Sequence, residues 1–520
     1  MASTTTLDVM NPPLPARPLK RRAFLAGVIA GGAALAACGR TATSHSTTNS
    51  TGGQQLSSLI DATEAARPHT GKTVSRRLTV APADVDLGGP VARTLLYDGT
   101  LPGPLLRANV GDDLAVTVTN GLDHPTSVHW HGLALRNDMD GAAPATPDID
   151  RDASFAYRFS SPYPGTYWAH PHTGLDTDFG LYLPVIIDDP AEPGRYDAEW
   201  IVMLDDWTSG VGKAPQQIFD ELRSAGMPGH RGMPGMPGMG SMPRPTGGQA
   251  SDMLGGDGGD VSYPYYLVNG RIPAAPSTFS AKPGQRIRIR IINAAADTAF
   301  RVALAGHRMT VTHTDGFPVV PTDVDAVLLG MGERYDVIVT AGDGVFPLVA
   351  AAEGKDAVAR ALLSTGAGSA ADPQLRPPEL GGRVATVDTV TAAPEVVLSS
   401  GSSDVALEAR LGGSMMGYTW TINGRTFDQT VPLTIRRGQH ATVTFTNNTM
   451  MWHPMHLHGH TFQVLRAGAQ PGPRKDTVIV KPMQTVAVAL VADNPGIWML
   501  HCHNGYHMDA GMMTTLDYTG

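Results

Sequence analysis

Apolar and polar residues alternate strictly in three short stretches of the chain, VTVT, IRIRI and TVTF, within residues 98–120, 269–293 and 423–447. A period of two residues is that of a half-buried β-strand, whose side chains point to opposite faces in turn. Each stretch follows an Asx-Gly turn and a glycine, and it ends at an asparagine nine residues after that glycine. The glycines are Gly111, Gly284 and Gly438, and the asparagines are Asn120, Asn293 and Asn447. The repeat predicts three homologous β-sandwich domains.

The spacing of the repeats places these domains at about residues 72–190, 195–365 and 385–520, with a Pro/Gly/Ala-rich linker at 366–384. Residues 226–260 interrupt the second domain with a low-complexity segment that begins GMPGHRGMPGMPGMG. Proline and glycine at this density exclude a regular helix or a central strand. We expect an exposed, mobile loop there.

Composition agrees with many short strands and tight turns, because the 520 residues include 59 Gly and 41 Pro and only 17% are charged. The formal charge is -9 and the isoelectric point is near 6.0. No basic face is implied, so a nucleic-acid partner is not expected.

The N-terminus has the pattern of an export signal. Lys20, Arg21 and Arg22 precede an apolar stretch of about 15 residues, which is too short to span a membrane. The RRAFL sequence resembles a twin-arginine signal, and LAAC resembles a lipobox in which Cys38 is lipidated after cleavage. The alternative is a plain signal with an incidental cysteine.

These N-terminal features predict a signal at residues 1–38 and a Ser/Thr-rich tether at 39–71. The mature protein is then expected in the periplasm or cell envelope, and it would contact the membrane only through a lipid anchor.

Ten of the 18 histidines fall in four clusters, HWHG, HPH, HPMHLH and HCHNGYH. On a strand, residues i and i+2 point to the same face, so an H-x-H pair can turn both imidazoles toward one place. The four pairs are His129/His131, His170/His172, His456/His458 and His501/His503. One such pair alone is more often structural, but four pairs from the first and third domains favour a site for copper, zinc or iron.

Cys502 lies between two of these histidines and points away from both of them. Its thiolate can therefore bind a second metal on the other side of the strand. His453 and His507 can supply two imidazoles and Met512 a weak thioether, which together make a blue-copper electron-transfer site. Zinc fits a Cys/His site too, but zinc is redox-inert. It could not pass an electron from the Cys502 site to the histidines on either side of the cysteine.

These clusters, in this order, resemble those of the multicopper oxidases, which include laccases, ascorbate oxidases and bacterial copper-efflux oxidases. The resemblance covers nearly the whole mature chain and implies an all-β fold of three cupredoxin-like Greek-key β-sandwich domains. It also implies four copper ions: one type 1, one type 2 and two type 3. The implied ligands are His453, Cys502, His507 and axial Met512 for type 1; His129 and His456 for type 2; His131, His170 and His503 for one type 3 ion; and His172, His458 and His501 for the other.

The family reaction oxidises a donor in four one-electron steps through Cys502 and reduces O2 to two waters. Asp140, in the MDG stretch after HWHG, matches an acid that family members place near the type 2 copper, which implies a catalytic role in proton relay. The alternative is a solvated turn carboxylate. Bacterial relatives often carry a glutamate after the last type 1 histidine; Met508 stands there instead, so the second acid of the relay is not identified.

The segment at 226–260 is the main clue to the donor. It carries a series of methionines, Met227, Met233, Met236, Met239 and Met242. Thioethers are soft ligands that select Cu(I), and a Pro/Gly loop has no core for methionine to fill. The pattern favours a cuprous oxidase that converts Cu(I) to Cu(II). We expect a monomer, because the histidine cluster lies within one chain. Oxidation of phenols or aromatic amines, oxidation of Fe(II) or Mn(II), and copper storage without catalysis stay open.

Overall fold

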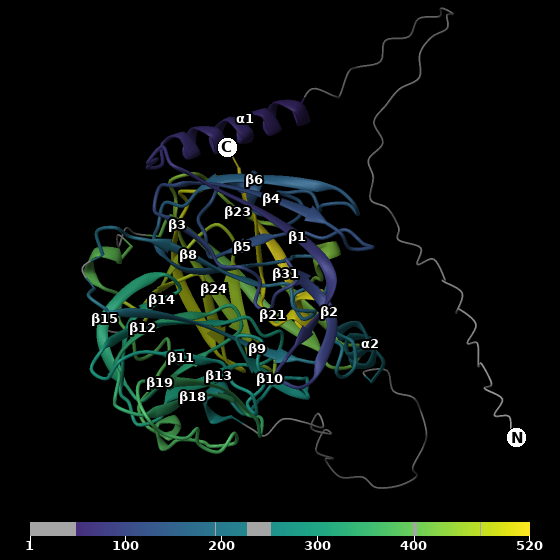
Figure 1. The fold of residues 1–520 in the computed structure, drawn as a ribbon. Coiled ribbons are helices and arrows are strands. Elements are labelled where there is room, and N and C mark those ends of the chain that lie inside the picture. The colour runs from purple at the N-terminus through teal and green to yellow at the C-terminus, as the bar shows by residue number, and fades with distance from the viewer. Residues whose placement is uncertain (1–47, 193, 226–250, 399–402, 468–469, 520) are drawn as a thin grey trace, which may run out of the picture. The chain divides into compact units, whose positions relative to one another are not determined.

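The computed structural model describes residues 48–192, 194–225, 251–398, 403–467 and 470–519. Its described part is built mostly from strands, which confirms the predicted all-β class (Figure 1). The predicted signal with Cys38 lies outside the described residues, and so do the methionines Met227, Met233, Met236, Met239 and Met242.

The first sandwich consists of two sheets that enclose one apolar core. One sheet has the order β2 (Val91–Tyr97), β1 (Thr73–Asp86), β4 (Asp113–Asn120), β6 (Ser154–Ser160), and the other β3 (Leu106–Asn109), β8 (Leu183–Asp188), β7 (Gly165–His170), β5 (His129–His131). Val80 and Val116 from the first sheet and Val185 from the second belong to the same buried cluster. The two apolar faces therefore cover each other, as the alternation along β4 requires.

The second sandwich pairs two longer sheets. One has the order β10 (Tyr265–Val268), β9 (Ala198–Trp207), β12 (Arg286–Asn293), β17 (Arg334–Thr340), β14 (Met309–Thr314), β15 (Phe317–Val324). The other has the order β11 (Thr278–Ser280), β19 (Val358–Ser364), β18 (Val345–Ala352), β13 (Phe300–Leu304), β16 (Ala326–Leu329), β20 (Val384–Ala385). β20 begins at Val384, the last residue of the predicted linker. The end of the linker therefore forms an edge strand of this sheet.

The third sandwich follows the same plan. One sheet has the order β22 (Thr419–Ile422), β21 (Val405–Ser414), β24 (His440–Asn447), β29 (Thr485–Val491), β26 (Phe462–Val464), β27 (Arg474–Lys475). The other has the order β23 (Leu433–Ile435), β31 (Met513–Tyr518), β30 (Ile497–Cys502), β25 (His453–Leu457), β28 (Thr477–Val480).

The asparagine that ends each sequence repeat has the same structural role in all three sandwiches. It ends β4, β12 or β24 and is fully buried, at Asn120, Asn293 and Asn447. In the third sandwich its side-chain amide donates to the carbonyls of Met451, at 2.7 Å, and Val480, at 3.1 Å. A buried amide needs such partners, so this residue fixes the loop that leads into β25 and its histidines.

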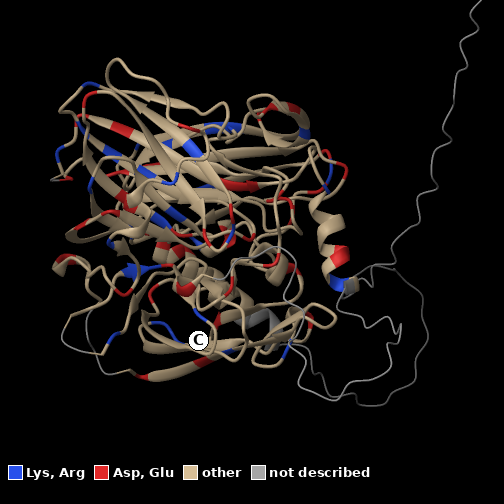
Figure 2. Cartoon of the chain, turned by 90° about the horizontal axis from the view of Figure 1, so that it is seen from below, with Lys and Arg blue, Asp and Glu red and all other residues tan. Residues whose placement is uncertain are grey.

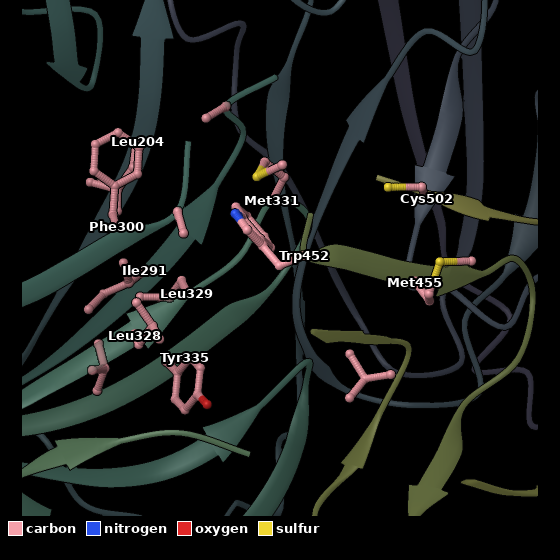
Figure 3. Close-up of a cluster of buried hydrophobic side chains, with 14 of the residues drawn as sticks. Leu204, Ile291, Phe300, Leu328, Leu329, Met331, Tyr335, Trp452, Met455 and Cys502 are labelled. Atoms are coloured by element: carbon pink, nitrogen blue, oxygen red, sulfur yellow. The ribbon is translucent and has the colours of Figure 1, made fainter. Parts of the chain in front are cut away.

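The cores of the second and third sandwiches are continuous. Figure 3 shows Trp452, the residue before β25 of the third sandwich, beside Met331 of the second, with Met455 and Cys502 further along. Trp452 is 2% exposed and Met331 fully buried. The second sandwich therefore supports the strand that carries His453.

Helices are short additions to these sheets. They are α1 (Thr48–Ala65), α2 (Pro215–Ala225) and α3 (Gly505–Asp509). Among the described residues, no helix has the length and apolar character needed to cross a membrane. Lys and Arg positions are interspersed with Asp and Glu positions on the strands and loops seen in Figure 2, so the view shows no face of a single charge.

The predicted tether at residues 39–71 differs from the structure in its second half, which forms α1. Glu64 accepts a hydrogen bond from the backbone N–H of Ser160 at 2.9 Å, and Asp61 pairs with Arg136 at 2.8 Å. Leu56 packs against the large core. The Ser/Thr-rich composition did not indicate that this segment forms a helix, or that apolar residues on one helix face pack against the sandwiches.

Candidate metal centre

The four histidine pairs meet between the first and third sandwiches. His129 on β5 lies opposite His170 on β7, and His456 on β25 lies opposite His501 on β30. The two antiparallel pairs of strands turn their imidazoles toward each other. The rings of His129 and His458 stack across the boundary with centroids 3.6 Å apart. Because the two imidazoles of each H-x-H pair lie on the same face, all eight rings form one cluster.

Ring nitrogens face one another within this cluster. The Nε2 atoms of His172 and His458 lie 3.3 and 3.0 Å from Nε2 of His501. Nδ1 of His131 lies 3.2 Å from Nε2 of His503. Groups of such nitrogens that lie within 4.8 Å of one another could hold a metal ion.

Most of these rings use the other nitrogen to hold themselves in place. The pairs are His129 Nδ1 with Asp140 O, His131 Nε2 with Asp476 Oδ1, His170 Nδ1 with Pro171 O, His456 Nδ1 with Asp476 O, His458 Nδ1 with Asp140 Oδ2, and His501 Nδ1 with Cys502 O. Such partners fix the tautomer and orientation of a ligating histidine.

The inner nitrogens are left free for a ligand. Within the described residues, the Nε2 atoms of His129, His170 and His456 are buried and have no hydrogen-bond partner. A buried polar atom is rarely left in that state unless an ion or water takes it. The donor set of imidazoles around these atoms therefore fits copper.

Burial and the neighbouring rings favour the neutral form of most imidazoles in the cluster. Burial, and then the neighbouring imidazoles of His129 and His456, lower the pKa of His172 to about 3. The same two causes, burial first, hold the pKa values of His170, His458, His501 and His503 well below the usual range. Neutral imidazole is the form that binds a metal, so the protein presents its ligands ready for use.

The ligand sets implied by the sequence are neighbours in space. His131, His170 and His503 have ring centroids 4.9 to 5.7 Å apart. His129 and His456, one from each sandwich, are separated by 5.8 Å.

A separate site surrounds the thiol of Cys502. Its Sγ lies 3.6 Å from Nδ1 of His453 and 3.8 Å from Nδ1 of His507, and the two nitrogens are 3.1 Å apart. All three residues are buried. Met512 is fully buried too, and its carbonyl accepts from the Cys502 N–H at 3.1 Å. Asn504 caps α3 and so places His507, since its side chain accepts from the His507 N–H.

Comparison with protein families decides the identity. Three models, each described as multicopper oxidase, match residues 79–192, 198–368 and 402–519. The chain is a multicopper oxidase. The resemblance inferred from the histidine motifs is thereby confirmed.

Similar proteins support the family and the fold. The oxidase is 60% identical to the multicopper oxidase MmcO of Mycobacterium tuberculosis, over 96% of this chain and 97% of MmcO. It is 28% identical to a copper resistance protein A homolog of Pseudomonas syringae, over 84% of this chain and 90% of the homolog. The crystal structure of a laccase from Botrytis aclada superposes with a TM-score of 0.71, at 24% identity, and covers 88% of this chain and 90% of the laccase.

As a multicopper oxidase the protein takes four copper ions, one type 1, one type 2 and two type 3, and uses O2 with a reducing substrate. The structure holds two candidate metal sites, the cluster of eight histidines and the site around Cys502. They are joined through β30, because Cys502 lies between His501 and His503, and the His501 ring bonds the Cys502 carbonyl at 2.9 Å.

Asp140 lies directly against the histidine cluster of the oxidase. Its carboxylate accepts from Nδ1 of His458 at 2.8 Å, and its carbonyl accepts from Nδ1 of His129 at 3.0 Å. Its side chain is fully buried. The alternative of a solvated turn carboxylate is therefore wrong, because the turn after β5 folds inward against β25.

Sequence reasoning missed Asp476, which contacts the cluster from the opposite side. Its carboxylate lies 3.1 Å from Nε2 of His131, and its carbonyl accepts from Nδ1 of His456. Arg334, from the second sandwich, holds this carboxylate with two bonds of 2.7 Å. Burial would raise the pKa of Asp476, but Arg334 and then His131 hold it well below its usual range. No motif in RKDTV signalled this role.

Replacing Asp476 by asparagine should lower either the oxidase activity or the copper affinity by about 10- to 100-fold. Changes of this size are typical for residues that hydrogen-bond to metal-binding histidines. The asparagine keeps the size of the side chain but removes the nearer of the two carboxylates that pair with Arg334, because Asp315 lies 3.6 Å away. Copper content and oxygen uptake measured on the same preparation separate the two effects. Asp404→Asn serves as the control, because Asp404 is an exposed carboxylate whose contacts are with the backbone of His440. Wild-type values for both measurements would show that Asp476 has no such role.

The sequence also gave no sign of Asp260, the last residue of the predicted insert. Its carboxylate accepts from Nε2 of His507 at 3.0 Å and from the Tyr418 hydroxyl at 2.6 Å. Burial would lower the pKa of His507, but Asp260 and the Cys502 thiol raise it to about 10.

The prediction that all of 226–260 is an exposed loop is wrong for its end. A 3-10 helix at Asp252–Leu254 buries Leu254 completely, and Ser251 donates to Glu353. Apolar burial at Leu254 anchors this end on the second sandwich, which GGDGGD alone did not indicate.

Proposed function

We propose that the two clusters divide the copper ions as the motifs imply. His453, Cys502, His507 and Met512 would hold the type 1 ion, and the eight clustered histidines the other three. Copper bound there supplies one-electron transfer and the reduction of O2. The chain's own part is to hold these imidazole and thiol donors in a buried site, and to supply protons through Asp140.

We further propose that the physiological donor is Cu(I). The observation that carries this proposal is the contact between Asp260 and His507, because it ties the end of the Met-rich insert to an imidazole of the type 1 site. A carboxylate there favours a cationic donor over a neutral phenol. The thioethers of the insert prefer Cu(I) among the candidate cations.

Two further observations support a role in copper handling. Relatives of this chain include proteins named for copper resistance. Met253 precedes Asp260 in the described part of the insert and packs, partly buried, against the core that contains Cys502. Oxidation would turn Cu(I) into the less toxic Cu(II), with O2 as the acceptor, in a protein that acts as a monomer.

The donor is tested by oxygen uptake with Cu(I), Fe(II) and a simple phenol at equal copper loading. Changing Met227, Met233, Met236, Met239 and Met242 to leucine keeps the length and apolar character of the insert but removes its thioethers. We expect kcat/KM for Cu(I) to fall about tenfold, with phenol oxidation unchanged. Asp260→Asn should reduce Cu(I) and Fe(II) oxidation more than phenol oxidation.

An equal loss of kcat/KM for all three donors would show that the insert does not select the donor. Efficient phenol turnover by the wild type with little Cu(I) oxidation would favour a laccase-type enzyme instead. Absence of oxygen uptake with every donor would favour copper storage.

The place of action is also proposed from the sequence. We infer export by a twin-arginine-type signal and anchoring in the cell envelope by lipid on Cys38. In the native host, Cys38→Ala should move the protein from the membrane fraction to the soluble fraction without loss of oxidase activity. An unchanged membrane fraction would show that Cys38 is not the anchor.

A further inference from the structure

A cavity of about 1140 Å³ lies beside the second sandwich, away from the copper ligands. Its floor includes Arg286, Arg288 and Arg290, which alternate along β12. The intervening isoleucines of β12 are fully buried in the core, so the arginines occupy the outer face of the sheet. Residues 163–165 of the first sandwich form part of the wall, together with the connecting segment at 194–196. The cavity is therefore lined by parts of two sandwiches and by the chain between them.

Two of the arginines on the floor are neutralised by the protein. Arg288 pairs with Asp336 at 2.6 Å and also with Glu192, and Arg290 pairs with Glu199 at 2.6 Å and with Asp336 at 3.1 Å. Burial would raise the pKa of Asp336, but the two guanidinium groups lower it to about 2. This part of the floor is a fixed and satisfied network.

Arg195 and Arg286 differ from that pair. They line the same cavity, yet within the described parts of the chain neither guanidinium has an ion pair or a hydrogen bond. In all, the cavity is lined by five arginines and by three carboxylates, Asp189, Glu192 and Glu395. Arg308 also pairs with a carboxylate, Asp325, at 3.7 Å. The free guanidinium donors of Arg195 and Arg286 suit an anion, since arginine binds carboxylate and phosphate-like groups through paired N–H donors.

Another part of the lining is apolar. It includes Ile187, Phe317, Val319, Val320 and Val396. Val320 leaves 43% of its surface exposed, which is costly for a valine on a rigid strand. Small-molecule sites have volumes of about 300–1000 Å³, with apolar walls and a few polar groups that fix orientation. The cavity is slightly larger than this range, and its lining combines apolar and polar groups in the same way.

We propose that this cavity binds a small organic anion with an apolar or aromatic body and a carboxylate- or sulfonate-type head. The head lies against Arg195 and Arg286, and the body against the valines of β15 and Val396. None of the lining residues is a proposed copper ligand, so the molecule is a regulator or stabiliser and not the electron donor. It also joins residues of two sandwiches, so its binding stabilises their interface.

The probe is 8-anilinonaphthalene-1-sulfonate, which has both features and fluoresces when shielded from water. Titration of the copper-loaded oxidase should show saturable binding of one probe per chain and a rise in Tm with probe concentration, because only the folded protein binds it. Arg195→Glu combined with Arg286→Glu should weaken binding by about tenfold or more. Arg77→Glu, an exposed arginine on β1 outside the cavity, should leave the affinity unchanged.

A second variant keeps the test valid if the double charge reversal impairs folding. Val320→Trp adds no charge and fills part of the cavity from an exposed position, so it should also weaken binding. Unsaturable binding, or equal affinity in the wild type and in a folded variant of either kind, would overturn the proposal.

Discussion

Replacing Cys502 by serine is expected to abolish both the blue colour of the copper-loaded oxidase and its oxygen uptake with any donor. The thiolate is the ligand that gives a type 1 site its colour, and it is also the link between the two clusters. A serine hydroxyl is a poor ligand and stays protonated at neutral pH. Activity should fall to the background rate, and the copper content should fall by one ion per chain. Absorption, metal analysis and oxygen uptake on one preparation check this result.

The matched control is Met508→Leu, at the residue after His507. Met508 is half-buried and is not among the proposed ligands. It should keep the colour, the copper and the activity. Retention of either colour or turnover in Cys502→Ser would remove Cys502 from its proposed role.

Replacing Asp140 by asparagine is expected to lower turnover by about 100-fold, equivalent to about 2.7 kcal/mol in the barrier, which is within the range for a general acid. The amide oxygen can still accept the bond from Nδ1 of His458, and the carbonyl that holds His129 is unchanged. Copper content and blue colour should therefore stay at wild-type values, while the carboxyl's ability to exchange protons is lost. Steady-state oxygen uptake at several pH values measures the loss.

Asp138→Asn provides the matched control for Asp140, because it changes a carboxylate in the same turn. The side chain of Asp138 is 42% exposed and pairs with Arg136. This variant should keep full turnover. A loss of copper in Asp140→Asn that accounts for its loss of activity would make Asp140 a positioning residue and not a proton donor.

The second sandwich, which carries no implied ligand, contributes more to the site than its sequence indicated. Arg334 extends from it to Asp476, and Asp260 from it to His507. Residues from all three sandwiches therefore hold the histidines in place. Any change that loosens the second sandwich should affect both clusters.

The sequence by itself determined the strand repeats, the H-x-H pairs and the thiol between His501 and His503. These features depend on the two-residue period of a strand, which is local, so spacing alone could predict which side chains share a face. The asparagine at the end of each repeat was visible too, although its bonds to distant carbonyls were not.

Only the tertiary structure decided which charges support those side chains. Asp476, Arg334 and Asp260 lie far from their partners in sequence, and their roles depend on contacts between sandwiches. A carboxylate has no periodicity that distinguishes a surface position from a buried one. Its function is set by what burial places against it, and that is a property of the packed chain.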